Sequence, residues 1–253
     1  MEPLLTLTDV DYTYQTPESE TPAVNHLNFC VYPDKFLGII GPSGCGKSTI
    51  LSLIAGLLPP SSGTIRLQTD PSGLSGIGYM LQKDHLLEWL TIKENLSLGP
   101  KIHHQLTPEK EKWIDHMLSE YGLARFADAR PSELSGGMRQ RAALIRTLAM
   151  EPRLLLLDEP FSALDYQTRL TVADDIYRIL RKQHKSAVLV THDISEAVSF
   201  CDQIIILSKR PATVKMTMDI QLTISGARTP FRARLAPEFK DFFNRIWGEL
   251  NES

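Results

Sequence analysis

The fold is decided by the stretch FLGIIGPSGCGKSTILSLIAGL, residues Phe36–Leu57. Its centre satisfies the pattern G-x-x-x-x-G-K-[ST] through Gly41, Gly46, Lys47 and Ser48. The apolar run before this loop predicts a buried strand, and the segment after the loop predicts a helix. In that arrangement backbone N–H groups and the helix N-terminus converge on a phosphate group. The stretch therefore predicts the strand, phosphate-binding loop and helix of an α/β nucleotide-binding domain.

The side chains of this loop have separate predicted roles. The Lys47 ammonium neutralises the β and γ phosphates, the Ser48 hydroxyl binds Mg²⁺, and Thr49 supports the α-phosphate side. Cys45 is expected to fill space and to take no part in redox chemistry. The residues assigned to nucleotide binding are Gly41, Ser43, Gly44, Cys45, Gly46, Lys47, Ser48 and Thr49.

A second predicted strand ends in two carboxylates, in LLLLDEP, residues Leu154–Pro160. Four consecutive leucines predict a strand that is buried on both faces. The carboxyl end of such a strand is where an open α/β sheet binds ligands, so Asp158 is expected to hold Mg²⁺ directly or through water. Glu159 is placed to polarise an attacking water as general base. The alternative for Glu159 is a surface or capping acid.

Composition excludes several classes of protein. The chain has 253 residues, enough for one large α/β domain, and a formal net charge of −3 with no long basic block, which argues against a nucleic-acid surface. Its three cysteines form no CxxC pair and no metal-ligand cluster, which argues against a disulfide framework or a zinc site. The first residues, MEPLLTLTDV, lack the basic start and apolar core of a secretory signal, and no apolar run approaches the length needed to span a bilayer. We expect a cytoplasmic protein that reaches a membrane only through a partner.

The order of patterned segments predicts one domain over residues 1–253 with a mostly parallel sheet covered on both faces. An antiparallel β lobe is expected first, with the turn-rich stretch 15–23 between its strands. A helical subdomain is expected at about 83–152, including a helix capped by Thr107 with Pro108 at its first position. Another helix is expected at Tyr166–Lys182. The segment at about 230–253 predicts a C-terminal helix whose apolar stripe packs on its own domain: Phe239, Phe242, Phe243, Ile246, Trp247 and Leu250.

LSGGMRQR, residues Leu134–Arg141, is a second glycine-rich turn. Ser135 is a good N-cap for the helix that follows, but a helix start does not explain Gly136 and Gly137. Each glycine costs a helix about 1 kcal/mol relative to alanine, and bare backbone at a helix N-terminus suits the approach of a ligand. A γ-phosphate delivered by another subunit meets that description.

Together these motifs resemble the ATP-binding subunit of ABC transporters over nearly the whole chain. Seven elements occur in the order of that family, which makes the resemblance specific. They are GPSGCGKST (like Walker A), LSGGM (signature), LLLLDE (Walker B), SALD at Ser162–Asp165 (D-loop), VTHD (switch-histidine segment), Gln82 (Q-loop) and Tyr14 (adenine-stacking aromatic).

The resemblance implies ATP and Mg²⁺ as ligands and a head-to-tail dimer with a second copy or a related subunit. The signature residues Ser135, Gly136 and Gly137 of one subunit then close over the ATP held by the other. Asp165 helps to join the two sites across the dimer. Met138 stands where the family commonly has glutamine, so no side-chain hydrogen bond to the nucleotide is assigned there.

The resemblance also implies roles for three residues of the chain's own site. Tyr14 stacks on adenine, and Gln82 reaches the Mg²⁺ and the water while reporting to a membrane partner. His192 contacts the γ-phosphate and fixes the water together with Glu159. Without the resemblance, His192 is equally well explained as a strand-end histidine satisfied by Asp193.

Three segments resemble the nitrate, sulfonate and taurine type of bacterial importer: LSGGMRQR, LLEWLTIKENLSLG and DFFNRIWGEL. The implied partners are separate integral membrane permease subunits and, indirectly, an extracytoplasmic solute-binding protein. Leu86–Ile92 is the candidate docking groove, with helical-subdomain core as its equal alternative. The alternative function is an ABC-type ATPase that acts on a non-membrane partner such as the ribosome; a single cassette without a basic arm disfavours it.

Overall fold

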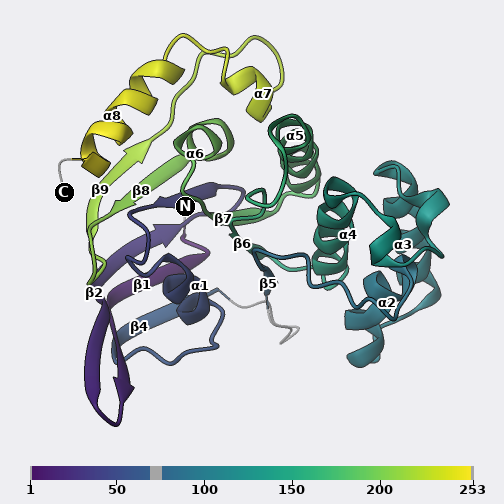
Figure 1. Cartoon of the computed structure of the whole chain (residues 1–253), viewed down its shortest axis with the longest axis horizontal. Helices are drawn as coiled ribbons and strands as arrows, with labels where there is room; N and C mark the ends of the chain where they lie inside the picture. The colour runs from purple at the N-terminus through teal and green to yellow at the C-terminus, as the bar shows by residue number, and fades with distance from the viewer. Residues whose placement is uncertain (1, 69–75, 252–253) are drawn as a thin grey trace.

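The computed structural model describes residues 2–68 and 76–251 in two sheets and the helices around them (Figure 1). The α/β fold expected from the sequence is confirmed. The strands are β1 Leu5–Thr16, β2 Ser19–Val31, β3 Phe36–Ile40, β4 Ser62–Leu67, β5 Ile77–Met80, β6 Leu154–Asp158, β7 Ser186–Val190, β8 Gln203–Leu207 and β9 Val214–Asp219. The α-helices are α1 Lys47–Ile54, α2 Ile92–Ile102, α3 Pro108–Glu120, α4 Gly136–Leu148, α5 Tyr166–Lys182, α6 Ile194–Phe200, α7 Pro230–Ala233 and α8 Phe239–Asn251.

The larger sheet has the order β5-β6-β7-β3-β8-β9, parallel except at the antiparallel β8–β9 edge. Every residue of β3, β6 and β7 is buried. Successive side chains of a strand point to opposite faces. Accordingly, Leu155 and Leu157 pack with the helical side of the molecule, whereas Leu154 and Leu156 pack under the N-terminal lobe. A strand with two apolar faces leaves only its ends for polar chemistry.

The N-terminal lobe is an antiparallel sheet of order β2-β1-β4. The turn-rich stretch 15–23 does contain a turn, but one shorter than expected, because β1 continues to Thr16 and β2 begins at Ser19, directly opposite. Cross-strand pairing satisfies the backbone groups of this polar stretch, so it needs only a two-residue turn. Its composition indicates exposure correctly but does not indicate a loop.

Three helices, α2, α3 and α4, form a lobe to one side of the larger sheet (Figure 1). The predicted start of α3 is confirmed: the Thr107 side chain accepts a hydrogen bond from the Lys110 N–H, and Pro108 is the first helical residue. Met117 is fully buried in this lobe, while Trp113 and Tyr121 pack against the core from partly buried positions. The helical lobe therefore has its own apolar interior, continuous with that of the sheet.

The C-terminal helices lie on the same side of the larger sheet as α5 and α6 (Figure 1). Ile246 of α8 is buried, and most of the predicted stripe packs against the core. Trp247 departs from the prediction, because it is 57% exposed and stacks on Phe243 with ring centroids 6.3 Å apart. Residues 252 and 253 of the predicted segment lie outside the described residues. Within the described residues, none of the helices has the length and apolar character needed to cross a bilayer.

Two glycines provide a matched test of this packing. A Cβ at Gly78 in β5 would lie 2.6 Å from Thr147 Cγ2 and 2.8 Å from Pro152 Cγ, whereas one at Gly248 in α8 would meet none of the described atoms within 4 Å. We expect Gly78→Ala to lower the free energy of unfolding by about 1–3 kcal/mol, as overpacking does. Gly248→Ala should raise it by roughly 0.5–1 kcal/mol through helix propensity. Urea unfolding measures both, and equal stability of the two variants would contradict the packing at β5.

Candidate functional site

The phosphate-binding loop connects β3 to α1 and depends on glycine conformations. Gly44 and Gly46 have φ angles of +74° and +123°, in the region that L side chains rarely adopt. A Cβ at Gly46 would also lie 3.0 Å from the carbonyl oxygen of Ala23. Gly46 is the N-cap of α1 and has no side chain to cap the first N–H groups of the helix. The backbone at this helix start is therefore shaped for an anionic ligand.

Lys47 places a buried positive charge beside this helix start. Its side-chain nitrogen donates to the carbonyl oxygens of Gly41 at 2.8 Å and Pro42 at 3.0 Å, and the residue is only 8% exposed. Both acceptors are neutral, and an ammonium has three N–H donors. A buried charge is costly unless an opposite charge compensates it. The ammonium thus fits a phosphate group at the loop.

Asp158 at the end of β6 faces the same helix start. The Ser48 hydroxyl donates to its Oδ1 at 3.3 Å, and the Tyr79 hydroxyl donates to its Oδ2 at 3.4 Å. Burial raises the pKa of Asp158, and burial together with the Asp158 charge raises the pKa of Tyr79 to about 12. A nearby cation would stabilise the ionised form of this carboxyl group.

The ligand chemistry of this corner suits Mg²⁺. Within residues 2–68 and 76–251 there is no group of three or more His, Cys, Asp or Glu side chains that could hold a metal ion. Mg²⁺ commonly takes one or two protein oxygens and completes its shell with water and substrate phosphates. The hydroxyl of Ser48 and the carboxylate of Asp158 fit that mode of binding.

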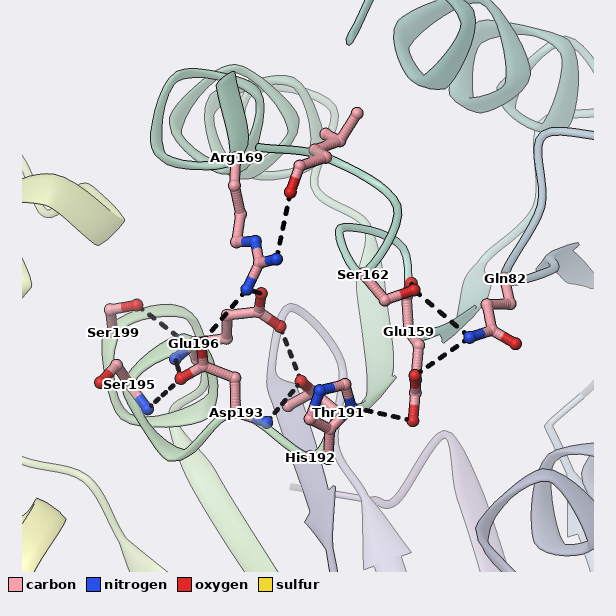
Figure 2. A network of polar contacts seen from close by, with 11 residues as sticks. Gln82, Glu159, Ser162, Arg169, Thr191, His192, Asp193, Ser195, Glu196 and Ser199 are labelled. Atoms are coloured by element: carbon pink, nitrogen blue, oxygen red, sulfur yellow. Dashed lines mark hydrogen bonds and ion pairs between the residues drawn. The ribbon is translucent and has the colours of Figure 1, made fainter. Parts of the chain in front are cut away.

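Glu159 is the centre of a second polar cluster, directly after Asp158 (Figure 2). Its Oε1 lies 3.2 Å from Nδ1 of His192, and its Oε2 accepts a hydrogen bond from Nε2 of Gln82 at 3.2 Å. Gln82 also donates to the Ser162 hydroxyl at 3.4 Å. Glu159 has a φ of +46°, uncommon for a residue with a side chain, and such outliers cluster at functional sites. The side chains of Gln82 and His192, from two separate loops, thus meet at the Glu159 carboxylate.

Tyr14 lies next to the phosphate-binding loop, on β1. Its hydroxyl shares a 3.0 Å hydrogen bond with the Thr49 hydroxyl, and the residue is 39% exposed. The guanidinium carbon of Arg210 lies 5.9 Å from the centre of the Tyr14 ring. A partly exposed aromatic ring beside the loop is available to stack on a flat base.

The second glycine-rich turn lies at the start of α4, and Figure 1 shows α4 well apart from α1. The predicted N-cap is confirmed, since the Ser135 side chain accepts a hydrogen bond from the Met138 N–H. Gly137 has a structural reason within the chain: a Cβ there would lie 2.8 Å from Thr168 Cγ2 and 3.0 Å from Val172 Cγ2 of α5. The sequence indicates ligand approach for this glycine and carries no signal of its packing against α5.

Asp165 also has a structural role within the chain. It is the N-cap of α5, and its side chain accepts a hydrogen bond from the Thr168 N–H at 3.1 Å. The described contacts of Ser135, Gly137 and Asp165 are thus made around α4 and α5. By contrast, Gln82, Glu159 and His192 meet in one cluster, and Ser48 meets Asp158.

Sequence patterns gave no indication of two polar residues at the site, Tyr79 and Arg210, and indicated Ser162 only as the first residue of the segment SALD. Tyr79 is on β5 and pairs in parallel register with Leu156, so its side chain lies near the end of β6. Ser162 is three residues after Glu159, and its hydroxyl donates a hydrogen bond to the Glu159 carbonyl oxygen at 3.0 Å. Tyr79 could not be assigned from sequence, because a short apolar strand carries no signal of which strand it pairs with or in what register.

Comparison with known proteins gives one consistent result. Residues 24–162 match the family profile described as "ABC transporter". The protein named "Uncharacterized ABC transporter ATP-binding protein YtlC" of Bacillus subtilis (strain 168) is 47% identical over 96% of this chain and 94% of its own length. The nitrate import ATP-binding protein NrtD of a Synechocystis species is 34% identical over 96% of this chain and 93% of its own length.

A solved structure shows the same fold. The dimeric, post-hydrolysis state of the ATP-binding cassette MJ0796, bound to ADP and Pi, superposes with a TM-score of 0.73 and 31% sequence identity. The match covers 86% of this chain and 99% of that one.

Asp158 should destabilise the protein when no nucleotide is bound. Because burial raises its pKa above 3.8, the folded chain holds a proton more readily than the unfolded chain, and stability falls as the pH rises through the folded pKa. We expect Asp158→Asn to raise the melting temperature near neutral pH by roughly 2–4 °C, the effect of about 1 kcal/mol in a chain of this size. The gain should shrink in acid, where the carboxyl group is protonated in both states. Thermal unfolding across the pH range measures this, and a destabilised variant at neutral pH would contradict it.

Proposed function

The chain belongs to the ABC transporter family, and from this membership we propose that it is the energy-coupling ATP-binding subunit of a bacterial importer. It is an ATPase that uses ATP and Mg²⁺. The proposed solute is a small anion of the nitrate, sulfonate or taurine type, supported by the likeness to the nitrate import protein. The observation that carries the proposal is the position of Glu159, held between Gln82 and His192 one residue beyond Asp158.

The chain's own residues divide the work of hydrolysis. Lys47 and the backbone of the loop bind the β and γ phosphates, and Ser48, Asp158 and Gln82 would hold Mg²⁺. Mg²⁺ bound there would neutralise negative charge on the β and γ phosphates while the γ-phosphoryl group is transferred to water and ADP leaves. Glu159 accepts a proton from the attacking water, and His192 orients that water and contacts the γ-phosphate. Tyr14 stacks on the adenine.

A second subunit completes the site. Ser135, Gly136 and Gly137 are proposed to cover the ATP of the partner, and Asp165 to meet the partner's site. The support is geometric: within one chain, α4 lies far from the loop at α1 (Figure 1). The partner is a second copy or a related subunit, arranged head to tail.

The proposed permease contact uses part of the segment Leu86–Ile92. Leu86 and Ile92 are buried in the core of the helical lobe, so these two residues are not docking residues. Trp89 between them is 68% exposed. We assign docking on a membrane permease to Trp89 and its exposed neighbours, with residues 83–152 acting as the helical subdomain that carries them and residues 230–253 as a C-terminal helical segment.

Through that permease the chain is proposed to sit at the cytoplasmic face of the membrane. An extracytoplasmic binding protein is proposed to deliver the solute to the permease. ATP binding then closes the ATPase dimer, and hydrolysis reopens it, so that the permease alternates its access in step.

Glu159→Gln tests the assignment of the general base. Glutamine keeps the size and one hydrogen-bond acceptor but accepts no proton, so turnover should fall by about 10²-fold or more. Binding of ATP should stay within about twofold, since uniform binding does not require the base. Steady-state hydrolysis and equilibrium binding with a fluorescent ATP analogue measure the two quantities. A variant that still turns over would remove Glu159 from this role.

Co-purification from the native host tests the importer assignment. Tagged chain is recovered from detergent-solubilised membranes, and mass spectrometry should find a multi-spanning permease in stoichiometric amount. Trp89→Ser should lose that permease, whereas Trp247→Ser, at a second exposed tryptophan, should keep it. Recovery of only ribosomal or other non-membrane proteins would leave the ATPase standing and overturn the importer.

A further inference from the structure

Arg169 on the first turn of α5 touches two separate loops of the site (Figure 2). Its Nη2 donates to the carbonyl oxygen of Leu164 at 3.1 Å. Its Nη1 lies 3.5 Å from Oδ2 of Asp193 and 3.7 Å from Oε1 of Glu196. Leu164 precedes Asp165, and Asp193 follows His192. One guanidinium therefore joins the loop before α5 to the loop that carries His192.

Glu196 is the buried anchor of this connection. It is 4% exposed, and its Oε2 accepts a hydrogen bond from the Thr191 hydroxyl at 2.6 Å. Burial raises its pKa. A buried carboxylate needs both hydrogen bonds and a positive partner, and Arg169 lies within ion-pair distance to serve as one. This makes the position of Arg169 hard to change without moving Glu196.

The two residues beside His192 are both held by this cluster. The Thr191 hydroxyl donates to Glu196 and accepts a hydrogen bond from the Asp193 N–H at 3.0 Å. Asp193 also caps α6 by accepting from the N–H groups of Ser195 at 2.7 Å and Glu196 at 3.2 Å. The backbone is thus fixed on both sides of His192, while the His192 side chain is mostly exposed and reaches Glu159.

We propose that Arg169 is a positioning residue for His192. It holds the His192 segment through Glu196 and Asp193, and through its hydrogen bond to Leu164 it also follows the position of the loop Leu164–Asp165. The inference rests on the proposed role of His192. Since Asp165 is proposed to meet the partner subunit, a shift of that loop on dimer closure would move the Arg169 guanidinium and with it the segment Thr191–Asp193. Arg169 itself touches neither water nor phosphate in this scheme.

The test uses the purified full-length chain and the variants Arg169→Gln, Arg169→Lys, His192→Ala and the double variant Arg169→Gln/His192→Ala. Arg181→Gln is the control, because Arg181 is on the same helix and forms an ion pair with Asp202, Nη2 to Oδ1 2.7 Å, at the far end of α5, away from His192. The measurements are kcat for ATP, the Kd of a fluorescent ATP analogue, and the melting temperature.

We expect Arg169→Gln to lower kcat at least about fivefold, with Kd within about twofold of the wild type and a loss of melting temperature no larger than that of Arg181→Gln. Arg169→Lys should recover part of kcat, since lysine keeps the charge toward Glu196 but loses the planar fork that also reaches Leu164. In the His192→Ala background, Arg169→Gln should bring no further loss, because the two residues act as a unit.

Three results would overturn the inference: a kcat for Arg169→Gln equal to that of Arg181→Gln, a parallel fall of kcat and ATP affinity, or a full additional loss in the His192→Ala background. A wild-type kcat in His192→Ala would instead refute the proposed role of His192. Loss of turnover in His192→Ala without loss in Arg169→Gln refutes only the inference about Arg169.

Discussion

The site depends on the parallel pairing of β3, β7 and β6, which brings their carboxyl ends to one edge. Val190 of β7 pairs with Ile39 on one side and with Asp158 on the other. The register therefore sets Asp158 level with the end of β3, two residues before the phosphate-binding loop begins. The Glu159 N–H extends this ladder by donating to the Val190 carbonyl at 2.9 Å. Because the strands are buried on both faces, their ends are the positions where charged groups can meet a ligand.

Assembly of charged groups at that edge works against stability. Lys47 and Asp158 are both nearly buried, and Glu159 adopts a left-handed backbone conformation that is unfavourable for a residue with a side chain. A chain selected for stability alone would replace these groups with neutral ones. The proposed ligands account for their presence, because phosphate at Lys47 and a divalent cation at Asp158 would carry the opposite charges. The apolar strands beneath the site supply the stability that this edge lacks.

Local sequence patterns predicted the elements that carry their own signals: the strand β6, the loop after β3, and the caps Thr107 and Ser135. Local patterns failed where the conformation or exposure of a residue depends on contacts with residues distant in sequence. The polar stretch 15–23 forms a hairpin because β1 and β2 pair across it, and Trp247 is exposed although it shares a helical stripe with Ile246. Tyr79 and Arg169 escaped notice for the same reason. Tyr79 contacts Asp158 and Arg169 contacts Glu196, residues that only the strand order and the packing of α5 bring near.

The first turn of α5 contacts three segments of the proposed site: the start of α4, the loop Leu164–Asp165 and the loop that carries His192. Thr168 donates its N–H to Asp165 and packs its methyl group against the backbone of Gly137, and the next residue, Arg169, binds the loop that carries His192. Three segments with proposed roles at the ATP sites therefore touch the start of one helix. Packed interfaces of this kind respond to a small shift as a unit, because close packing leaves no room for independent adjustment. In the proposed scheme, a displacement of α4 or of the Leu164–Asp165 loop by a partner subunit would therefore also shift the segment around His192.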